Sequence, residues 1–154
     1  MLARIRKSLD EKDQGFTLIE LLVVMIIIGI LAAIAIPVFL SQRAKAQDTA
    51  TKADASTVGK EITSYFVDGS GAPTLAITNG RYLVNGVDAG KASNGVKFNS
   101  GTEAAPAEAT TFATGTTSDK WCVSFVNLNG SKKTFKYSAQ NGLEQGTCSS
   151  ATAP

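Results

Sequence analysis

The sequence predicts an α+β fold, in which one long N-terminal α-helix is followed by a small antiparallel β-sheet. Two observations support this prediction. From Leu21 to Leu40, 20 consecutive residues carry no ionisable side chain, a length typical of a helix that crosses a membrane. After residue 69, short segments of alternating apolar and polar residues are separated by turn residues, which is typical of antiparallel strands.

The composition argues against catalysis and against nucleic-acid binding. The chain has 154 residues, enough for one compact domain with an appendage. Lysine and arginine number 15 against 13 acidic residues, so there is no basic excess of the kind that binds nucleic acid directly. Histidine, the commonest general base and metal ligand near neutral pH, is missing from the sequence. We therefore expect no enzymatic activity, no cofactor and no metal site.

The first 40 residues divide into a charged leader, residues 1–15, and an apolar segment, Phe16–Leu40. As a helix this segment would be about 37 Å long at about 1.5 Å per residue, enough to cross a bilayer. Its many Val and Ile residues favour a strand, but a strand of this length would be exceptional. An ordinary secretory signal fits poorly because acidic residues precede the apolar run, although Ala32–Ala35 could serve as its cleavage site. A plain single-span anchor also stays open.

An acidic residue, Glu20, lies inside the apolar segment. An ionised carboxylate at the centre of a bilayer costs about 3 kcal/mol, and such residues are usually functional. Cleavage of the chain between Gly15 and Phe16 would create a positively charged amine close to Glu20 in the sequence. Within one straight helix the two groups are poorly placed to meet, but they can pair between staggered neighbouring helices. The charge pattern therefore indicates self-assembly.

These residues belong to a recognisable pattern. The segment Gly15-Phe16-Thr17-Leu18-Ile19-Glu20, followed by LLVVMIIIGILAAIAIPVFLSQ, resembles the class III signal of type IV prepilins and of the related pseudopilins. The resemblance is close from Gly15 to Gln42, and beyond about residue 66 it concerns architecture only. The leader, with its mixed charges, is similar to those of Gram-positive bacterial prepilins.

The resemblance implies a pilin-like fold and a role as structural subunit of a type IV pilus. A prepilin peptidase would cut after Gly15 and methylate the new amine of Phe16. Glu20 would then neutralise the Phe16 amine of an adjacent subunit. The helix would loosen between Gly29 and Pro37 within a filament, in agreement with the hydrogen bond that a proline removes.

The resemblance also implies partners and a location. The chain would be a single-pass protein of the cytoplasmic membrane with its head outside, and later part of a cell-surface filament. Its partners would be copies of itself, the prepilin peptidase, the pilus assembly platform, minor pilins and, before assembly, membrane lipid. Adhesion, motility, DNA uptake and biofilm formation are candidate roles of such a filament.

The second half of the helix, residues 41–68, is predicted to be amphipathic. One stripe steps along it by three and four residues, which predicts a face that packs on a sheet; it consists of Thr51, Ala55, Val58, Ile62 and Tyr65. Asp48 and Lys52 are expected to form an i, i+4 pair on the surface. Gly59 weakens the helix by about 1 kcal/mol, and the turn residues at 68–73 should end it.

Residues 69–154 are predicted to form a loop, the antiparallel sheet and a C-terminal region closed by a disulfide. The expected strands are 120–126, with Trp121, Val123 and Phe125 on one face, and 133–137, 81–84 and 95–98. Five Asn-Gly pairs predict tight turns, and residues 99–118 read as an exposed loop.

The two cysteines, Cys122 and Cys148, lie in the last third of the chain. If this part is exported, a disulfide between them is expected, and two free thiols in a cytosolic protein are the alternative. A similar disulfide pins the C-terminal loop in pilins.

Two other functions compete with a pilin. A pseudopilin of a type II-like secretion or DNA-uptake system shares the same N-terminal residues, but a secretion pseudopilin more often has a calcium-binding head in place of a disulfide. A membrane-tethered binding or enzymatic head that never polymerises is the third possibility. It would keep its N-terminus intact or be cut near Ala35.

Overall fold

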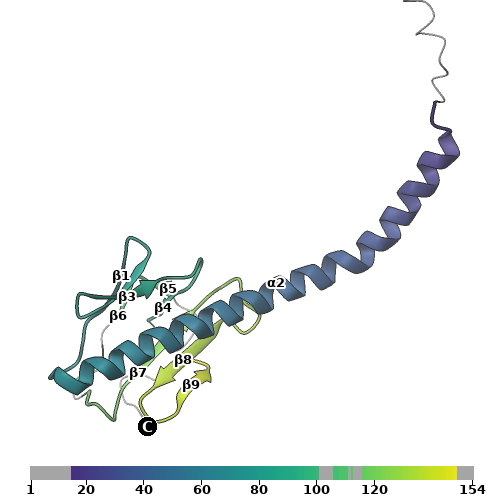
Figure 1. Ribbon diagram of the computed structural model, residues 1–154. Helices are drawn as coiled ribbons and strands as arrows, with labels where there is room; N and C mark the ends of the chain where they lie inside the picture. Colours follow the sequence, from purple (N-terminus) through teal and green to yellow (C-terminus); the bar gives the residue numbers. More distant parts are fainter. Residues whose placement is uncertain (1–14, 101–105, 111, 113–115, 149–154) are drawn as a thin grey trace, which may run out of the picture. The chain divides into compact units, whose positions relative to one another are not determined.

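The computed structural model describes residues 15–100, 106–110, 112 and 116–148. Over these residues the chain forms one helix, α2 (Leu18–Asp68), followed by short strands in two antiparallel sheets (Figure 1). The predicted α+β class is confirmed. The chain separates into two compact units, residues 1–40 and residues 41–154, which are described in turn below.

In the first unit, α2 begins at Leu18, two residues later than predicted, because Thr17 takes the N-cap position. The helix continues without a break through Gly29 and Pro37, so the loosening expected within a filament stays a prediction. The large apolar side chains from Phe16 to Leu40 are all exposed. Among the described residues, α2 is the one helix that is long and apolar enough to cross a membrane.

The second unit, the head, contains the remainder of α2 and both sheets. One sheet has the strand order β3-β2-β1-β6, and the other has the order β5-β4-β7-β8-β9. Their bounds are β1 (Leu75–Thr78), β2 (Arg81–Val84), β3 (Val87–Lys91), β4 (Lys97–Asn99), β5 (Pro106–Ala107), β6 (Ala109–Thr110), β7 (Cys122–Val126), β8 (Thr134–Ser138) and β9 (Gly142–Gln145).

Two expectations about the sheet were wrong in detail. We expected one sheet, and there are two. Residues 106–110 add an edge strand to each, since β5 pairs with β4 and β6 pairs with β1. Part of the predicted exposed loop at 99–118 is therefore strand. The predicted strands at 81–84, 95–98, 120–126 and 133–137 correspond to β2, β4, β7 and β8.

Four of the five Asn-Gly pairs lie in turns or bends, as predicted, and in the fifth Asn141 ends a turn while Gly142 begins β9. Asn79 and Gly80 join β1 to β2, and both have a left-handed φ, of 53° and 70°. Asn85 and Gly86 join β2 to β3 in the same way, with φ of 50° and 82°. Asparagine and glycine tolerate this conformation best, which is why the pair favours tight hairpins.

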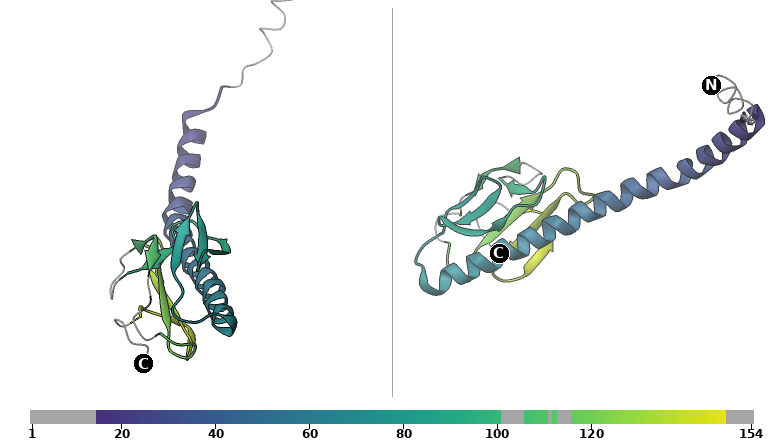
Figure 2. Two further views of the ribbon diagram at one scale, coloured as in Figure 1. Left: turned by 90° about the vertical axis from the view of Figure 1, so that its left-hand side faces the viewer. Right: turned by 45° about the horizontal axis from the view of Figure 1, so that its top comes forward.

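The second half of α2 lies against the sheets (Figure 2), and its predicted stripe is buried there. Thr51, Ala55, Val58 and Ile62 are fully buried, whereas Tyr65 is half-buried. They form part of the core of the head together with side chains of both sheets, among them Tyr82, Phe98, Trp121, Val123 and Phe125. The prediction that this stripe packs on a sheet is confirmed.

Gly59, which the sequence marked as a weak point of the helix, has a packing role. A Cβ atom at this position would overlap the ring of Tyr137 on β8. That ring stacks on Trp121, with the ring centroids 5.8 Å apart and an angle of 13° between the planes. The glycine therefore lets α2 and β8 approach closely, which offsets its low helix propensity.

Candidate functional site

The first turn of α2 holds the acidic residue that the sequence singled out. The hydroxyl of Thr17 accepts a hydrogen bond from the backbone N–H of Glu20 at 3.3 Å. The Glu20 carboxylate in turn accepts the backbone N–H of Thr17 at 2.9 Å and its hydroxyl at 2.7 Å. This reciprocal arrangement is a capping box. Sequence reasoning missed this second role of Glu20, although the spacing of Thr17 and Glu20 is its usual signal.

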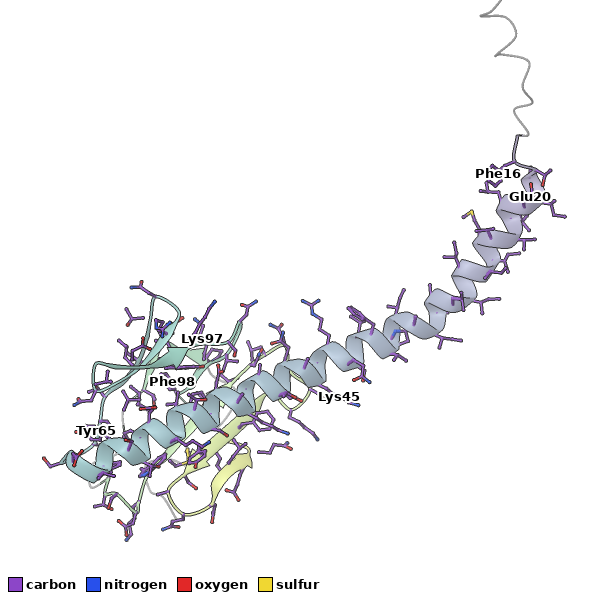
Figure 3. The ribbon with its side chains drawn as sticks, in the orientation of Figure 1. Phe16, Glu20, Lys45, Tyr65, Lys97 and Phe98 are labelled. Carbon is purple, nitrogen blue, oxygen red and sulfur yellow. A yellow bond between two sulfur atoms is a disulfide. The ribbon has the colours of Figure 1, made fainter. Side chains whose placement is uncertain are left out.

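The capping box provides Glu20 with hydrogen bonds but with no opposite charge. The ion pairs that the described residues form are Arg81–Asp88, Lys97–Glu108 and Lys136–Glu144. Glu20 lies at the same end of α2 as Phe16 (Figure 3), and both side chains are exposed. A carboxylate without a cation therefore stands at the start of an apolar helix.

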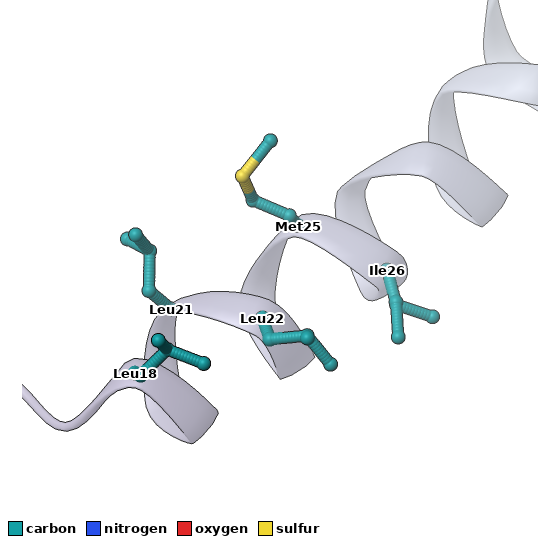
Figure 4. A pocket seen from close by; sticks show the side chains of 5 residues that line it. All are labelled: Leu18, Leu21, Leu22, Met25 and Ile26. Atoms are coloured by element: carbon teal, nitrogen blue, oxygen red, sulfur yellow. The ribbon is translucent and has the colours of Figure 1, made fainter.

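An open apolar groove lies on the first turns of α2, around Glu20 in the sequence. It is lined by Leu18, Leu21, Leu22, Met25 and Ile26, whose side chains line one side of α2 in Figure 4. Their spacing of three and four residues places them on one face of the helix. Such a face accepts the ridge of a second apolar helix.

The glycines of this segment have no explanation within the chain itself. A Cβ atom built on Gly15 or on Gly29 would meet nothing within 4 Å. Neither residue has the left-handed φ that favours glycine. If glycine is required at position 15, the requirement comes from a partner.

In the head, Asp54 of α2 forms hydrogen bonds with β2 and with the turn that follows β3. Its carboxylate accepts the Tyr82 hydroxyl at 2.9 Å, and the Ser93 backbone N–H and hydroxyl at 2.8 Å each. Burial, together with the nearby Asp54 carboxylate, raises the pKa of the Tyr82 phenol. The buried acid is thus held by neutral donors, as buried polar groups generally require.

Asp48 does not form the predicted surface pair with Lys52. Its side chain is buried, and both of its oxygens accept the backbone N–H of Lys132 at 3.0 Å. Next to it, the side-chain amide of Asn127 donates to Gln47 at 2.8 Å. The prediction failed because the connection between β7 and β8 folds back onto α2, which the spacing along the helix cannot reveal.

The two cysteines form the expected disulfide. Cys122 on β7 and Cys148, three residues after β9, are joined with a Cα–Cα distance of 5.9 Å. The bond ties the last described residue of the chain to a central strand of the five-stranded sheet. Among the described residues, no group of three or more His, Cys, Asp or Glu side chains could hold a metal ion.

The N-terminal sequence matches the model of a known protein family. Residues 11–36 match the prokaryotic N-terminal methylation motif. This chain carries a prepilin motif. The matched residues include Gly15, Phe16, Glu20 and Gly29, whereas Pro37 lies just beyond them.

Relatives of this chain include two groups, distinguished by their names. The chain is 35% identical over 95 residues to the fimbrial protein EcpC of Eikenella corrodens, covering 57% of this chain and 62% of the relative. It is 44% identical over 57 residues to the type IV major pilin protein PilA of Myxococcus xanthus, covering 37% of this chain and 26% of the relative.

The second group belongs to secretion systems. The chain is 36% identical over 63 residues to the type II secretion system core protein G of Pseudomonas aeruginosa, covering 41% of this chain and 44% of the relative. The chain therefore spans less than two thirds of each of these relatives. No solved structure is significantly similar to it. The Gram-positive origin suggested by the leader stays a prediction.

Proposed function

We propose that this protein is the structural subunit of a type IV pilus. The observation that carries the proposal is the prepilin motif at residues 11–36, followed by a helix that exposes its apolar side chains and leaves an apolar groove open. A helix that is apolar on all sides is stable only inside lipid or among other apolar helices. A pilin meets both environments in turn, first as a membrane protein and then in the filament. The role is structural rather than enzymatic.

In this proposal a prepilin peptidase removes residues 1–15 and methylates the amine of Phe16. Two features support the step. Gly15 has no packing or backbone role in the chain itself, as expected if the glycine serves the peptidase. Phe16 is 90% exposed, so the bond between the two residues is accessible.

Assembly then pairs Glu20 with the Phe16 amine of a neighbouring subunit. The support is that Glu20 has hydrogen bonds but no cation among the described residues. An unpaired charge in an apolar setting favours any arrangement that brings an opposite charge to it. Residues 16–40 would be the transmembrane and assembly segment, with a loosening between Gly29 and Pro37 in the filament.

The remaining segments have supporting roles. Residues 41–68 carry the head, and residues 69–154 form its loop, sheets and disulfide-closed end. Before assembly the chain would cross the cytoplasmic membrane once with the head outside. It would reach the surface through an assembly platform and minor pilins.

A pseudopilin is the second candidate, because secretion-system core proteins G from three organisms are 30–36% identical to parts of this chain. The disulfide favours the pilin. It joins the C-terminal residues to β7 and so stabilises a head that would bear load in a filament. Sheared surface filaments would decide between the two. A pilin should be their main component, and a pseudopilin should be scarce or missing.

The assembly role of Glu20 can be separated from its capping role by three variants. Glu20→Gln keeps a capping acceptor but removes the charge, whereas Thr17→Ala removes the cap but keeps the charge. Glu20→Ala removes both. We expect normal insertion for all three, few or no filaments for both Glu20 variants and abundant filaments for Thr17→Ala. Abundant filaments from Glu20→Gln would refute the charge pairing.

The mature N-terminus provides an independent test. Mass spectrometry of filaments should find methylated Phe16 as the first residue. An intact leader, or a first residue near Ala35, would overturn the proposed processing and leave a tethered head.

A further inference from the structure

A group of exposed basic residues gathers where the chain enters the head. Arg43, Lys45 and Lys52 lie on the first turns of α2 within this unit, and Lys132 and Lys133 lie on the connection between β7 and β8. We call these five residues the basic cluster. Lys45 is labelled in Figure 3.

The structure holds the two parts of the basic cluster together. The backbone N–H of Lys132 donates to Asp48, which lies between Lys45 and Lys52 on the helix. A side chain at Gly130 would overlap the Asp48 carboxylate, so the glycine lets the loop approach the helix. Lys133 has a left-handed φ of 64°, unusual for a residue with a side chain. The loop is therefore fixed against the helix at this point.

The five positive charges of the cluster outnumber the one negative charge that the structure places against it, on Asp48. None of the ion pairs formed by the described residues includes a member of it. Asp48, which lies between Lys45 and Lys52 on the helix, is buried and accepts a backbone N–H. The nitrogen of Lys52 lies 5.1 Å from the centroid of the Phe135 ring. The Lys52 side chain is nevertheless exposed. The cluster thus presents a cationic face.

From this placement we infer that, before assembly, the basic cluster binds the phosphates of anionic phospholipids. These lipids lie in the outer leaflet of the cytoplasmic membrane, on the side of the head. Arg43 follows the apolar segment by only three residues, so the cluster belongs to the part of the head where the chain leaves the lipid. This step rests on the proposed membrane insertion of residues 16–40. Basic residues next to a span bind anionic headgroups, with a gain of about fivefold in affinity for each charge at the surface.

Lipid contact would hold the loop, and with it the head, at the membrane until the subunit is extracted. The contact weakens with salt, because exposed charges are screened within about 8 Å at physiological ionic strength. The contact is therefore reversible.

The test uses the full chain in nanodiscs of phosphatidylcholine, with or without a minority of phosphatidylglycerol. Hydrogen exchange is measured for the backbone amides of residues 128–133. We expect exchange to slow about fivefold or more when the anionic lipid is present, since several charges act together. The effect should disappear at high salt.

A triple variant, Lys45→Gln, Lys132→Gln and Lys133→Gln, should lose this protection. Lys52 is left in place because it also covers Phe135. The matched control replaces the exposed residues Lys60, Lys91 and Lys120 by Gln and should keep the protection. Equal protection in both triple variants would refute the inference.

Other outcomes distinguish the alternatives. If the chain inserts into both kinds of nanodisc and exchange is the same in each, the inference fails while the proposed anchoring stands. Failure to insert into either kind refutes the anchoring itself. Protection by added duplex DNA, without protection by anionic lipid, would overturn the inference in favour of a nucleic-acid surface.

Discussion

The two halves of α2 have similar apolar side chains but opposite surroundings. Ile34 in the first half is 66% exposed, whereas Ile62 in the second half is fully buried in the head. The same helix therefore contains one half whose partner lies in the chain and one half whose partner does not. The difference is that the head buries the stripe of its half of the helix, whereas the described residues cover none of the large apolar side chains from 16 to 40.

The acidic residues of the helix show the same contrast. Asp54 receives three hydrogen bonds from the first sheet and its following turn. Among the described residues, the one donor of hydrogen bonds to the Glu20 carboxylate is Thr17, three residues away. Folding satisfies the first acid completely and leaves the charge of the second unpaired. The predictions below test this contrast in order of expected size.

Removing the disulfide should have the largest effect on the head and none on the apolar half. The double variant Cys122→Ser, Cys148→Ser should lower the free energy of unfolding by about 3–4 kcal/mol, because the open loop gains entropy in the unfolded chain. The single tryptophan, Trp121, is buried in the head, so its fluorescence during urea unfolding in detergent reports this unit alone. An unchanged midpoint would contradict the prediction.

Asp54→Ala should also destabilise the head, by about 2–3 kcal/mol, because the Tyr82 hydroxyl and the Ser93 groups lose their acceptor while buried or partly buried. Asp54→Asn is the matched control, since it keeps one acceptor oxygen. It should lose less, measured by the same fluorescence assay. An equal loss in both variants would mean that the charge, and not the hydrogen bonds, stabilises the contact.

Alanine at the two helical glycines should have opposite effects. Gly59→Ala should cost about 1–3 kcal/mol, because the new methyl group overlaps the Tyr137 ring. Gly29→Ala meets no atom of the chain and should strengthen the helix by up to about 1 kcal/mol. Thermal unfolding followed by tryptophan fluorescence and circular dichroism would measure both. A neutral Gly59→Ala would show that β8 can move away from α2.

The smallest effect should be a dependence of head stability on acidic pH. Hydrogen bonds from Arg81 and from the Gly90 backbone N–H lower the pKa of Asp88. A carboxyl whose pKa is lowered by folding stabilises the protein above its unfolded pKa. This contribution disappears as the pH falls through the lowered value. Urea midpoints measured across acidic pH should show a slightly weaker dependence in Asp88→Asn than in the natural chain.

Much of the fold could be predicted from the sequence because its signals are local. The stripe from Thr51 to Tyr65 and the alternation around Trp121 and Phe125 each predicted a buried face correctly. The apolar run fixed the type of the first element by its length alone. The N-terminal motif is likewise a continuous pattern, so its residues could be named before the structure was known.

The features that were missed depend on contacts between distant segments. β1, β3 and β9 have only four or five residues each, and β3 and β9 carry few apolar ones, so their identity as strands comes from their neighbours in the sheets. In the sequence, Asp48 and Asp54 look like ordinary surface acids of a helix. In the fold, Asp48 contacts the connection between β7 and β8, and Asp54 contacts β2. The role of Gly59 depends on a ring that lies 78 positions later in the sequence, at Tyr137.

The bonds from the β7–β8 connection to α2 also have a consequence for folding kinetics. They join residues 80 and 84 positions apart, at Gln47 with Asn127 and at Asp48 with Lys132. Contacts of such long sequence separation form slowly, because a large loop must close first. During synthesis the helix is therefore made well before its polar partners, and Gln47 and Asp48 stay in water until the connection between β7 and β8 has been made.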